Sequence, residues 1–379
     1  MDQGTCKTVI RVGSRKSELA LIQTKFVINQ LKELNPEIEF EIVSMTTMGD
    51  RVLDKPLPKI GEKSLFTKDL EVALLSGTVD FVVHSLKDLP TVMEIGTTIG
   101  AILKRDDPRD ALVLRDDCKQ FQLDSLPSKS LIGTSSLRRT AQLKRKFSNI
   151  QVSDVRGNLN TRLKKLDDDS QTIGKNSNTN YSGIILALAG IRRMGWEKRV
   201  SQIIDSDVML YAVGQGALAV ECRIGDEFIL EMLEPLHHYE TVLQVVAERG
   251  FLTRLGGGCS APVGIRSTVC LRKNAIFLDG AVWSLDGSEE LKYSSSAELA
   301  DKKVIQSHID QYRGEDGEPP KKCPYKQPRQ FVGVTPGKIS YLDLDIALKL
   351  GTELAENLIN QGALDIMNAA KDTIHSAIK

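Results

Sequence analysis

The stretch "VVHSLKDLP", residues 82–90, is an apolar run typical of a buried strand, and it ends in an adjacent lysine and aspartate. Before it, "TVIRVGS" (8–14) predicts another strand, and apolar residues recur at helical spacing over 17–34. This alternation of strand and helix predicts a doubly wound α/β sheet, in which ligands bind at the carboxyl ends of the strands. Lys87 and Asp88 stand at such an end.

The alternation continues in two further regions of the chain. A second set of strands and helices is expected over 106–212, with a long helix at 187–200. A third region begins near 238 with a helix over 239–255, followed by several short strands and two C-terminal helices. At 379 residues the chain is too long for one ordinary core, which also favours two or three domains.

Composition excludes several classes of protein. Lys plus Arg and Asp plus Glu both number 50, so affinity for a polyanion cannot rest on net charge. The six cysteines lack C-x-x-C pairs, so neither a zinc module nor a disulfide framework is predicted. Because the N-terminus has no apolar signal core and the longest apolar stretch, 183–191, is too short for a bilayer, we expect an intracellular protein without a membrane partner.

Basic residues cluster at two strand-to-helix junctions, "GTSSLRR" and "VRGNLNTRL". A helix N-terminus carries a positive dipole end, where an arginine is misplaced unless an anion binds there. The junctions therefore predict carboxylate or phosphate ligands, while solvated surface arginines remain the alternative for any single residue. Nucleic acid is disfavoured because aromatic residues make up only 5% and none interleaves with these arginines.

Two other stretches leave their alternatives open on local grounds. Lys87 and Asp88 could bind an anion and handle protons, or form a surface ion pair in a turn. In "LGGGCSAP" (255–262), Cys259 could be an attachment point, a nucleophile or a structural cysteine. No histidine base accompanies it in the motif, so chemistry of the cysteine protease kind is poorly supported.

Seven motifs in this order resemble the porphobilinogen deaminase (hydroxymethylbilane synthase) family: "RVGSRKSELALIQT", "GEKSLFTKDLE", "VHSLKDLPT", "GTSSLRR", "RGNLNTRL", "YAVGQGALAVE" and "GGCSAPV". The resemblance covers nearly the whole chain. It implies two lobes like those of periplasmic binding proteins and a smaller α+β third domain. The implied boundaries are 1–105 with 213–237, then 106–212, then 238–379 with an insertion near 312–330.

The resemblance also implies an enzyme of haem biosynthesis. Such an enzyme condenses four porphobilinogen molecules head to tail onto a dipyrromethane cofactor, releases ammonia at each step and hydrolyses the product to hydroxymethylbilane. The cofactor is expected on Cys259 through a thioether. No metal, no nucleic acid and no membrane partner are expected, and a cytoplasmic monomer is implied.

Site residues follow from the matching motifs. Asp88 is expected to be catalytic, since a carboxylate near the pyrrole N–H groups can stabilise the cation left by loss of ammonia. Every pyrrole carries an acetate and a propionate, which arginines suit as bidentate ligands. Expected near the substrate are Arg15, Ser17, Ser85 and Arg156. Expected at the cofactor, besides Cys259, are Lys87, Ser135, Arg138, Arg139, Arg162, Arg193, Gln215 and Gly216.

Two other classes of function compete with this one. A non-catalytic receptor for an organic anion would also have two lobes and arginines at helix N-termini, but it would leave the glycine-flanked Cys259 unexplained. A nucleotide- or phosphate-transferring enzyme would need a glycine-rich phosphate loop or acidic metal ligands, and the sequence has no P-loop or dinucleotide fingerprint.

Overall fold

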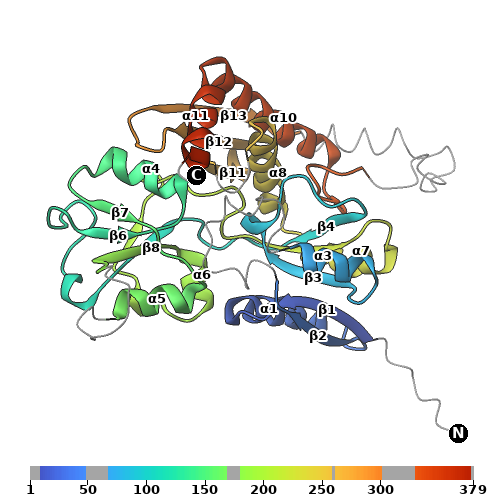
Figure 1. Cartoon of the computed structure of the whole chain (residues 1–379). Helices are drawn as coiled ribbons and strands as arrows, with labels where there is room; N and C mark the ends of the chain where they lie inside the picture. Colours follow the sequence, from blue (N-terminus) through green and yellow to red (C-terminus); the bar gives the residue numbers. More distant parts are fainter. Residues whose placement is uncertain (1–8, 48–66, 169–179, 258–260, 301–328, 377–379) are drawn as a thin grey trace, which may run out of the picture.

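The computed structural model describes residues 9–47, 67–168, 180–257, 261–300 and 329–376. Cys259, most of the loop at 168–181 and most of the insertion at 312–330 lie outside these residues. The described chain forms two lobes, each built on a five-stranded sheet, and a third unit built on a three-stranded sheet (Figure 1).

Lobe 1 contains the stretch with which the sequence analysis began. Its elements are β1 (Val9–Arg15), α1 (Glu18–Leu34), β2 (Glu39–Met45), α3 (Lys68–Leu75), β3 (Phe81–Ser85), β4 (Thr97–Ile102), β10 (Leu218–Arg223) and α7 (Glu227–Leu233). The sheet order is β2-β1-β3-β10-β4, and β10 runs antiparallel to its neighbours. Because side chains alternate along β3, Val83 packs in the core shared with α1, while Val82 packs in the one shared with α3.

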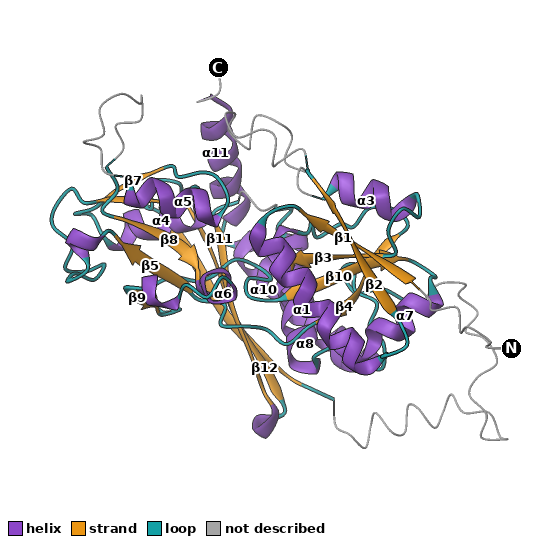
Figure 2. Cartoon of the chain, turned by 90° about the horizontal axis from the view of Figure 1, so that it is seen from below, coloured by secondary structure: helices purple, strands orange, loops and turns teal. Residues whose placement is uncertain are grey.

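Lobe 2 has the same sheet topology as lobe 1, although it is built from a different part of the chain. Its elements are β5 (Asp110–Leu114), β6 (Leu131–Gly133), α4 (Leu137–Lys146), β7 (Gln151–Ser153), α5 (Leu159–Asp167), β8 (Gly183–Ala187), α6 (Leu188–Arg193) and β9 (Gln202–Ile204). The order β7-β6-β8-β5-β9 matches that of lobe 1, with β5 as the antiparallel strand. Figure 2 shows the two sheets side by side with their helices packed against them.

The chain crosses between the lobes twice. Residues 103–109 lead from β4 to β5, and residues 205–217 lead back from β9 to β10. Each crossing therefore delivers the antiparallel strand of the next sheet. The predicted fold class, two lobes of the periplasmic-binding-protein kind plus a smaller α+β domain, is confirmed.

The third unit is an antiparallel sheet covered by helices. It consists of α8 (Tyr239–Arg254), β11 (Val263–Cys270), β12 (Ala275–Trp283), β13 (Glu290–Glu298), α10 (Tyr341–Asn360) and α11 (Ala363–Ser376). Its helix α8 also anchors both crossings, because Glu248 accepts hydrogen bonds from the Arg105 guanidinium (2.5 Å) and from the Gly214 N–H (2.8 Å). Arg105 and Glu248 are buried, so this ion pair fixes where the lobes join.

Several elements differ from the sequence-based expectation. The helix expected at 187–200 ends at Arg193, since Gly195 adopts a positive φ of 71° that helix residues do not. The strands β5, β9 and β10 and the helix α7 were not predicted. The third sheet has three strands of eight or nine residues rather than several short ones.

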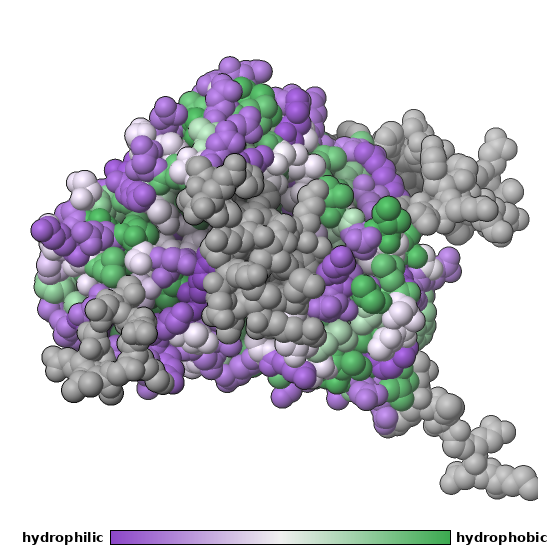
Figure 3. All heavy atoms as spheres, in the orientation of Figure 1, coloured by the Kyte–Doolittle hydropathy of each residue, from purple (hydrophilic) through white to green (hydrophobic). Residues whose placement is uncertain are grey.

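The described surface is mostly hydrophilic on the face seen in Figure 3, with hydrophobic residues scattered between polar ones. Among the helices of the described ranges, none is long and apolar enough to cross a membrane.

The packing of α8 against α10 generates a stability prediction. A Cβ at Gly351 would lie 1.9 Å from the Ala247 carbonyl oxygen, which belongs to the backbone of α8 and cannot rotate away. We expect Gly351→Ala to lower the free energy of unfolding by about 1–3 kcal/mol, as overpacking does. Urea unfolding measures this. The control is Gly225→Ala, where a Cβ meets no atom within 4 Å and only backbone strain applies. Equal stability of wild type and Gly351→Ala would contradict the close crossing.

Candidate active site

Four of the predicted site residues line one pocket in lobe 1. These are Arg15, Ser17, Ser85 and Asp88, and the pocket holds about 420 Å³, part of it open to solvent. Arg15 is the last residue of β1, Ser17 precedes α1, and Ser85 is the last residue of β3. The pocket therefore lies at the carboxyl ends of parallel strands, where the sequence placed it.

The stretch after β3 brings Asp88 to this pocket. Leu86–Asp88 form a single 3-10 turn in which Leu86 is buried and Asp88 is exposed. Leu86 holds the turn in place through the hydrogen bond from its N–H to the Ala217 carbonyl oxygen (3.0 Å). Ser85 is held by Gln23 of α1, whose side-chain nitrogen donates to the Ser85 hydroxyl at 2.9 Å. Thus buried contacts on both sides fix the direction of an exposed carboxylate.

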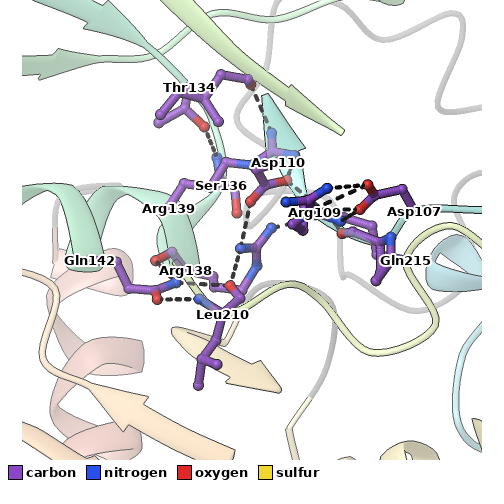
Figure 4. A network of polar contacts seen from close by, with 12 residues as sticks. Asp107, Arg109, Asp110, Thr134, Ser136, Arg138, Arg139, Gln142, Leu210 and Gln215 are labelled. Carbon is purple, nitrogen blue, oxygen red and sulfur yellow. Dashed lines mark hydrogen bonds and ion pairs between the residues drawn. The ribbon is translucent and has the colours of Figure 1, made fainter. Parts of the chain in front are cut away.

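Arg138 and Arg139 form a second centre, at the start of α4 in lobe 2 (Figure 4). Both are buried, with 4% and 5% of their surface exposed, and both donate to the carboxylate of Asp110. The distances are 2.8 Å from Arg138 Nη1 to Asp110 Oδ2 and 2.7 Å from Arg139 Nη2 to Asp110 Oδ1. The anion predicted at this helix N-terminus is therefore, in part, a carboxylate of the protein itself.

The charges of this centre do not balance. Burial acts to raise the pKa of Asp110, but Arg138 and Arg139 outweigh it and hold that pKa below its usual range. Burial lowers the pKa of Arg138. One carboxylate thus faces two guanidinium groups, and in the described part of the chain the buried Nε atoms of both arginines have no hydrogen-bond partner. A buried donor without a partner is costly, so these atoms indicate an acceptor that binds there.

Gln215, Gly216 and Arg193 lie where the chain crosses back to lobe 1. The Gln215 amide donates to Asp110 Oδ1 at 2.8 Å and to the Pro108 carbonyl oxygen at 2.6 Å. Gly216 has a φ of 88°, and a Cβ there would lie 2.6 Å from the Asp106 carbonyl oxygen, so this position requires glycine. Arg193 Nη2 donates to the Gly216 carbonyl oxygen at 2.7 Å. These three residues join the two crossings to each other.

Lys87 connects the pocket with the arginine centre. It is half-buried, and burial lowers its pKa to about 8. Asp88 and Asp110 oppose this shift, while the positive charges of Arg139 and Arg138 contribute to it. Of these consecutive residues of lobe 1, Asp88 lines the pocket, and Lys87 is acted on by the charges of Arg138, Arg139 and Asp110 in lobe 2.

Arg156 and Arg162 lie at the neighbouring junction of β7 with α5, and Ser135 precedes α4 and contacts that junction. Burial and the charge of Arg139 lower the pKa of Arg162 to about 10, and Asp88 is among the charges that act on Arg162. Arg156 forms an ion pair with Asp154. The Ser135 hydroxyl donates to the Val155 carbonyl oxygen at 2.6 Å. Arg162 and Lys87 are therefore both influenced by Arg139 and Asp88. Arg162 Nε also donates to the Gly157 carbonyl oxygen at 2.8 Å, so Arg162, Arg156 and Ser135 all have protein partners.

Sequence reasoning missed Asp110, Gln23, His84, Glu71 and Glu221. Asp110 follows the first crossing, and no motif or periodicity sets it apart from other aspartates in the segment. The other four are polar residues buried around the pocket in lobe 1. A search of the described residues for three or more metal-ligating side chains gives no cluster.

Comparison with known proteins identifies the family. The model "Porphobilinogen deaminase, dipyromethane cofactor binding domain" matches residues 10–231, and "Porphobilinogen deaminase, C-terminal domain" matches residues 242–306. The BvgS periplasmic VFT2 domain of Bordetella pertussis, a solved structure, is 13% identical with a TM-score of 0.35, covering 60% of this chain and 86% of its own. That score carries no inference about this chain.

Curated relatives agree over most of the sequence. A porphobilinogen deaminase of Synechococcus elongatus is 48% identical over 78% of this chain and 89% of its own length. A porphobilinogen deaminase of Nostoc is 45% identical over 83% of this chain and 93% of its own length. One from Dictyostelium discoideum is 40% identical over 97% of this chain and 98% of its own. The chain belongs to the porphobilinogen deaminase family.

Proposed function

We propose that this chain is a hydroxymethylbilane synthase, a transferase of haem biosynthesis. It condenses four porphobilinogen molecules head to tail onto a covalent dipyrromethane, with release of ammonia, and hydrolyses the product to hydroxymethylbilane. The observation that carries the proposal is the turn Leu86–Asp88, which lies between the pocket and the arginine centre. In this turn, Asp88 can act on a reacting pyrrole ring while Lys87 helps to bind the carboxylates of a neighbouring ring.

The residues around the arginine centre fit a dipyrromethane. When bound, that group supplies the ring carbon to which the first porphobilinogen is joined. The orphaned Nε atoms of Arg138 and Arg139 and the excess of positive charge suit its acetate and propionate groups. Cys259 is the proposed attachment point. It lies outside the described residues, between the end of α8 at Arg254 and the start of β11 at Val263.

The residue roles follow the same division. Asp88 is proposed as the catalytic carboxylate, aided by its exposure to the pocket. Arg15 can bind a substrate carboxylate from the end of β1, and the hydroxyls of Ser17 and Ser85 can orient it. Arg156 is proposed at the substrate. At the cofactor we propose Cys259, Lys87, Ser135, Arg138, Arg139, Arg162, Arg193, Gln215 and Gly216.

The domain boundaries and the cellular setting are also part of this proposal. Domain 1 comprises 1–105 and 213–237, domain 2 comprises 106–212, and domain 3 comprises 238–379. The crossings at 103–109 and 205–217 support the first two divisions. We propose a cytoplasmic monomer that acts on a small molecule and binds neither nucleic acid nor membrane.

Replacing the proposed catalytic carboxylate tests the function. We expect Asp88→Asn to fold and to keep the cofactor but to consume porphobilinogen at least about 100-fold more slowly, since proton transfer and charge stabilisation are lost together. Porphobilinogen consumption and ammonia release measure this. Asp124→Asn, an exposed aspartate of lobe 2, is the matched control and should keep the wild-type rate. A near-native rate for Asp88→Asn would refute the assignment. A wild-type protein that binds porphobilinogen without releasing ammonia would favour the receptor.

The depressed pKa of Lys87 gives a prediction in pH. A lysine whose pKa is lowered to about 8 loses its charge as the pH rises through that value, well before an ordinary lysine with a pKa of 10.5. In cofactor-free protein with methylated lysines, carbon-13 NMR should show one lysine titrating near pH 8. That signal should be absent from Lys87→Arg. It should move to higher pH once the cofactor is loaded, because a carboxylate stabilises the ammonium form. Titration at the ordinary value in the cofactor-free protein would contradict the account.

A further inference from the structure

Beneath the pocket of lobe 1 lies a buried group of titratable residues with no role so far. His84 of β3 lines the pocket together with Asp88 and is only 6% exposed. Glu221 of β10 and Glu71 of α3 lie behind it, with 0% and 2% of their surface exposed. We call His84, Glu221 and Glu71 the buried triad.

The triad is placed by the sheet itself. His84 is two residues beyond Val82, so both side chains are on the face that α3 covers. Glu221 is opposite Val82 in the antiparallel ladder and therefore shares this face. His84 Nε2 and Glu221 Oε2 are 3.0 Å apart. The strands β3 and β10 thus direct a base and an acid to one place under the pocket, and the charges of both act on Glu71 of α3.

Not all oxygens of the triad have partners. In the ranges that the structure describes, Glu221 Oε1 has no hydrogen-bond partner. A buried carboxylate oxygen without a partner is costly in its charged form. The arrangement is therefore poorly explained as a contact that only stabilises the fold.

Electrostatics favour the protonated form of Glu71. Burial raises the pKa of Glu71, a hydrogen bond from Thr67 and the charge of His84 lower it, and the charges of Glu221 and Glu94 raise it further. The other charged groups that face His84 across the pocket are Arg15 from β1 and Asp88 from the turn after β3.

The proposed reaction needs a second group that moves protons. When porphobilinogen is consumed, its aminomethyl C–N bond breaks and the electron pair leaves with ammonia. The attacking pyrrole carbon forms a new C–C bond to the methylene carbon that ammonia has left. Its C–H bond then breaks, the electron pair of that bond restores the aromatic ring, and one proton must be accepted. Asp88 stabilises the cation best while it is ionised, so a second acceptor in the pocket would share the proton transfers with it.

We propose that His84 is a second proton-transfer residue of the pocket, with Glu221 as its buried partner; this inference rests on the proposed function. Neutral His84 donates from Nε2 to Glu221, which leaves Nδ1 to accept the ring proton. Glu221 balances the imidazolium that forms, and the proton then passes to the departing ammonia or to solvent. This is the arrangement by which a carboxylate orients a histidine base.

The test compares two variants with a matched control in the cofactor-loaded protein. His84→Gln removes the titrating ring but keeps an amide that can reach Glu221, and Glu221→Gln removes the balancing charge. Thr98→Val is the control, since it removes another buried hydrogen bond of the same sheet, 2.8 Å long, to Thr335. Cofactor content, thermal midpoint, kcat, KM and the pH dependence of kcat are measured for each.

We expect His84→Gln to retain cofactor, to melt near Thr98→Val and to lose about 100-fold in kcat with little change in KM. In Glu221→Gln the acidic limb of the pH profile should move to lower pH, because the imidazolium loses its counter-charge. An unchanged kcat in His84→Gln, a loss that tracks the thermal midpoint, or a rise confined to KM would overturn the proposal. If the wild-type protein releases no ammonia, both this proposal and the proposed function are wrong. The other outcomes overturn this proposal alone.

Discussion

The bond between Asp110 and two buried arginines is the interaction on which the site depends. Asp110 stands where the chain first enters lobe 2, and Arg138 and Arg139 begin the helix beside it. The same carboxylate accepts from Gln215, which lies on the return crossing. Breaking such a pair leaves a buried charge uncompensated, at a cost of about 3–5 kcal/mol. Both crossings and the N-terminus of α4 are therefore tied to one side chain.

This bond also leaves the centre incomplete. One carboxylate faces two guanidinium groups, whose Nε atoms have no hydrogen-bond partner among the described residues. The charges of these groups also act on Lys87, whose pKa is lowered. Under the proposed function, the carboxylates of a pyrrole chain would accept from these donors and favour the charged form of Lys87. The proposed role of His84 and Glu221 adds proton transfer to this binding of charge.

Local patterns predicted the fold class and most helices, but not the pairing of distant segments. The strand β10 was not predicted, and it pairs with β3 and β4, which are more than a hundred residues away in sequence. The two lobes share one sheet order, but the sequence contains no repeat of fixed period, so local patterns did not predict this similarity between the lobes. At the site, strand ends and motifs pointed to Asp88 and the arginines. Asp110 and the triad could not be predicted, because their roles arise from contacts across strands and lobes.

The most direct test of this account is a crystal structure of the protein loaded with its cofactor. The account predicts a dipyrrole bonded to Cys259 Sγ, with carboxylate oxygens within hydrogen-bond distance of Arg138, Arg139 and Lys87 Nζ, and with Asp110 still bonded to both arginines. A dipyrrole attached elsewhere, or one whose carboxylates face solvent while the arginine Nε atoms stay unpaired, would contradict it.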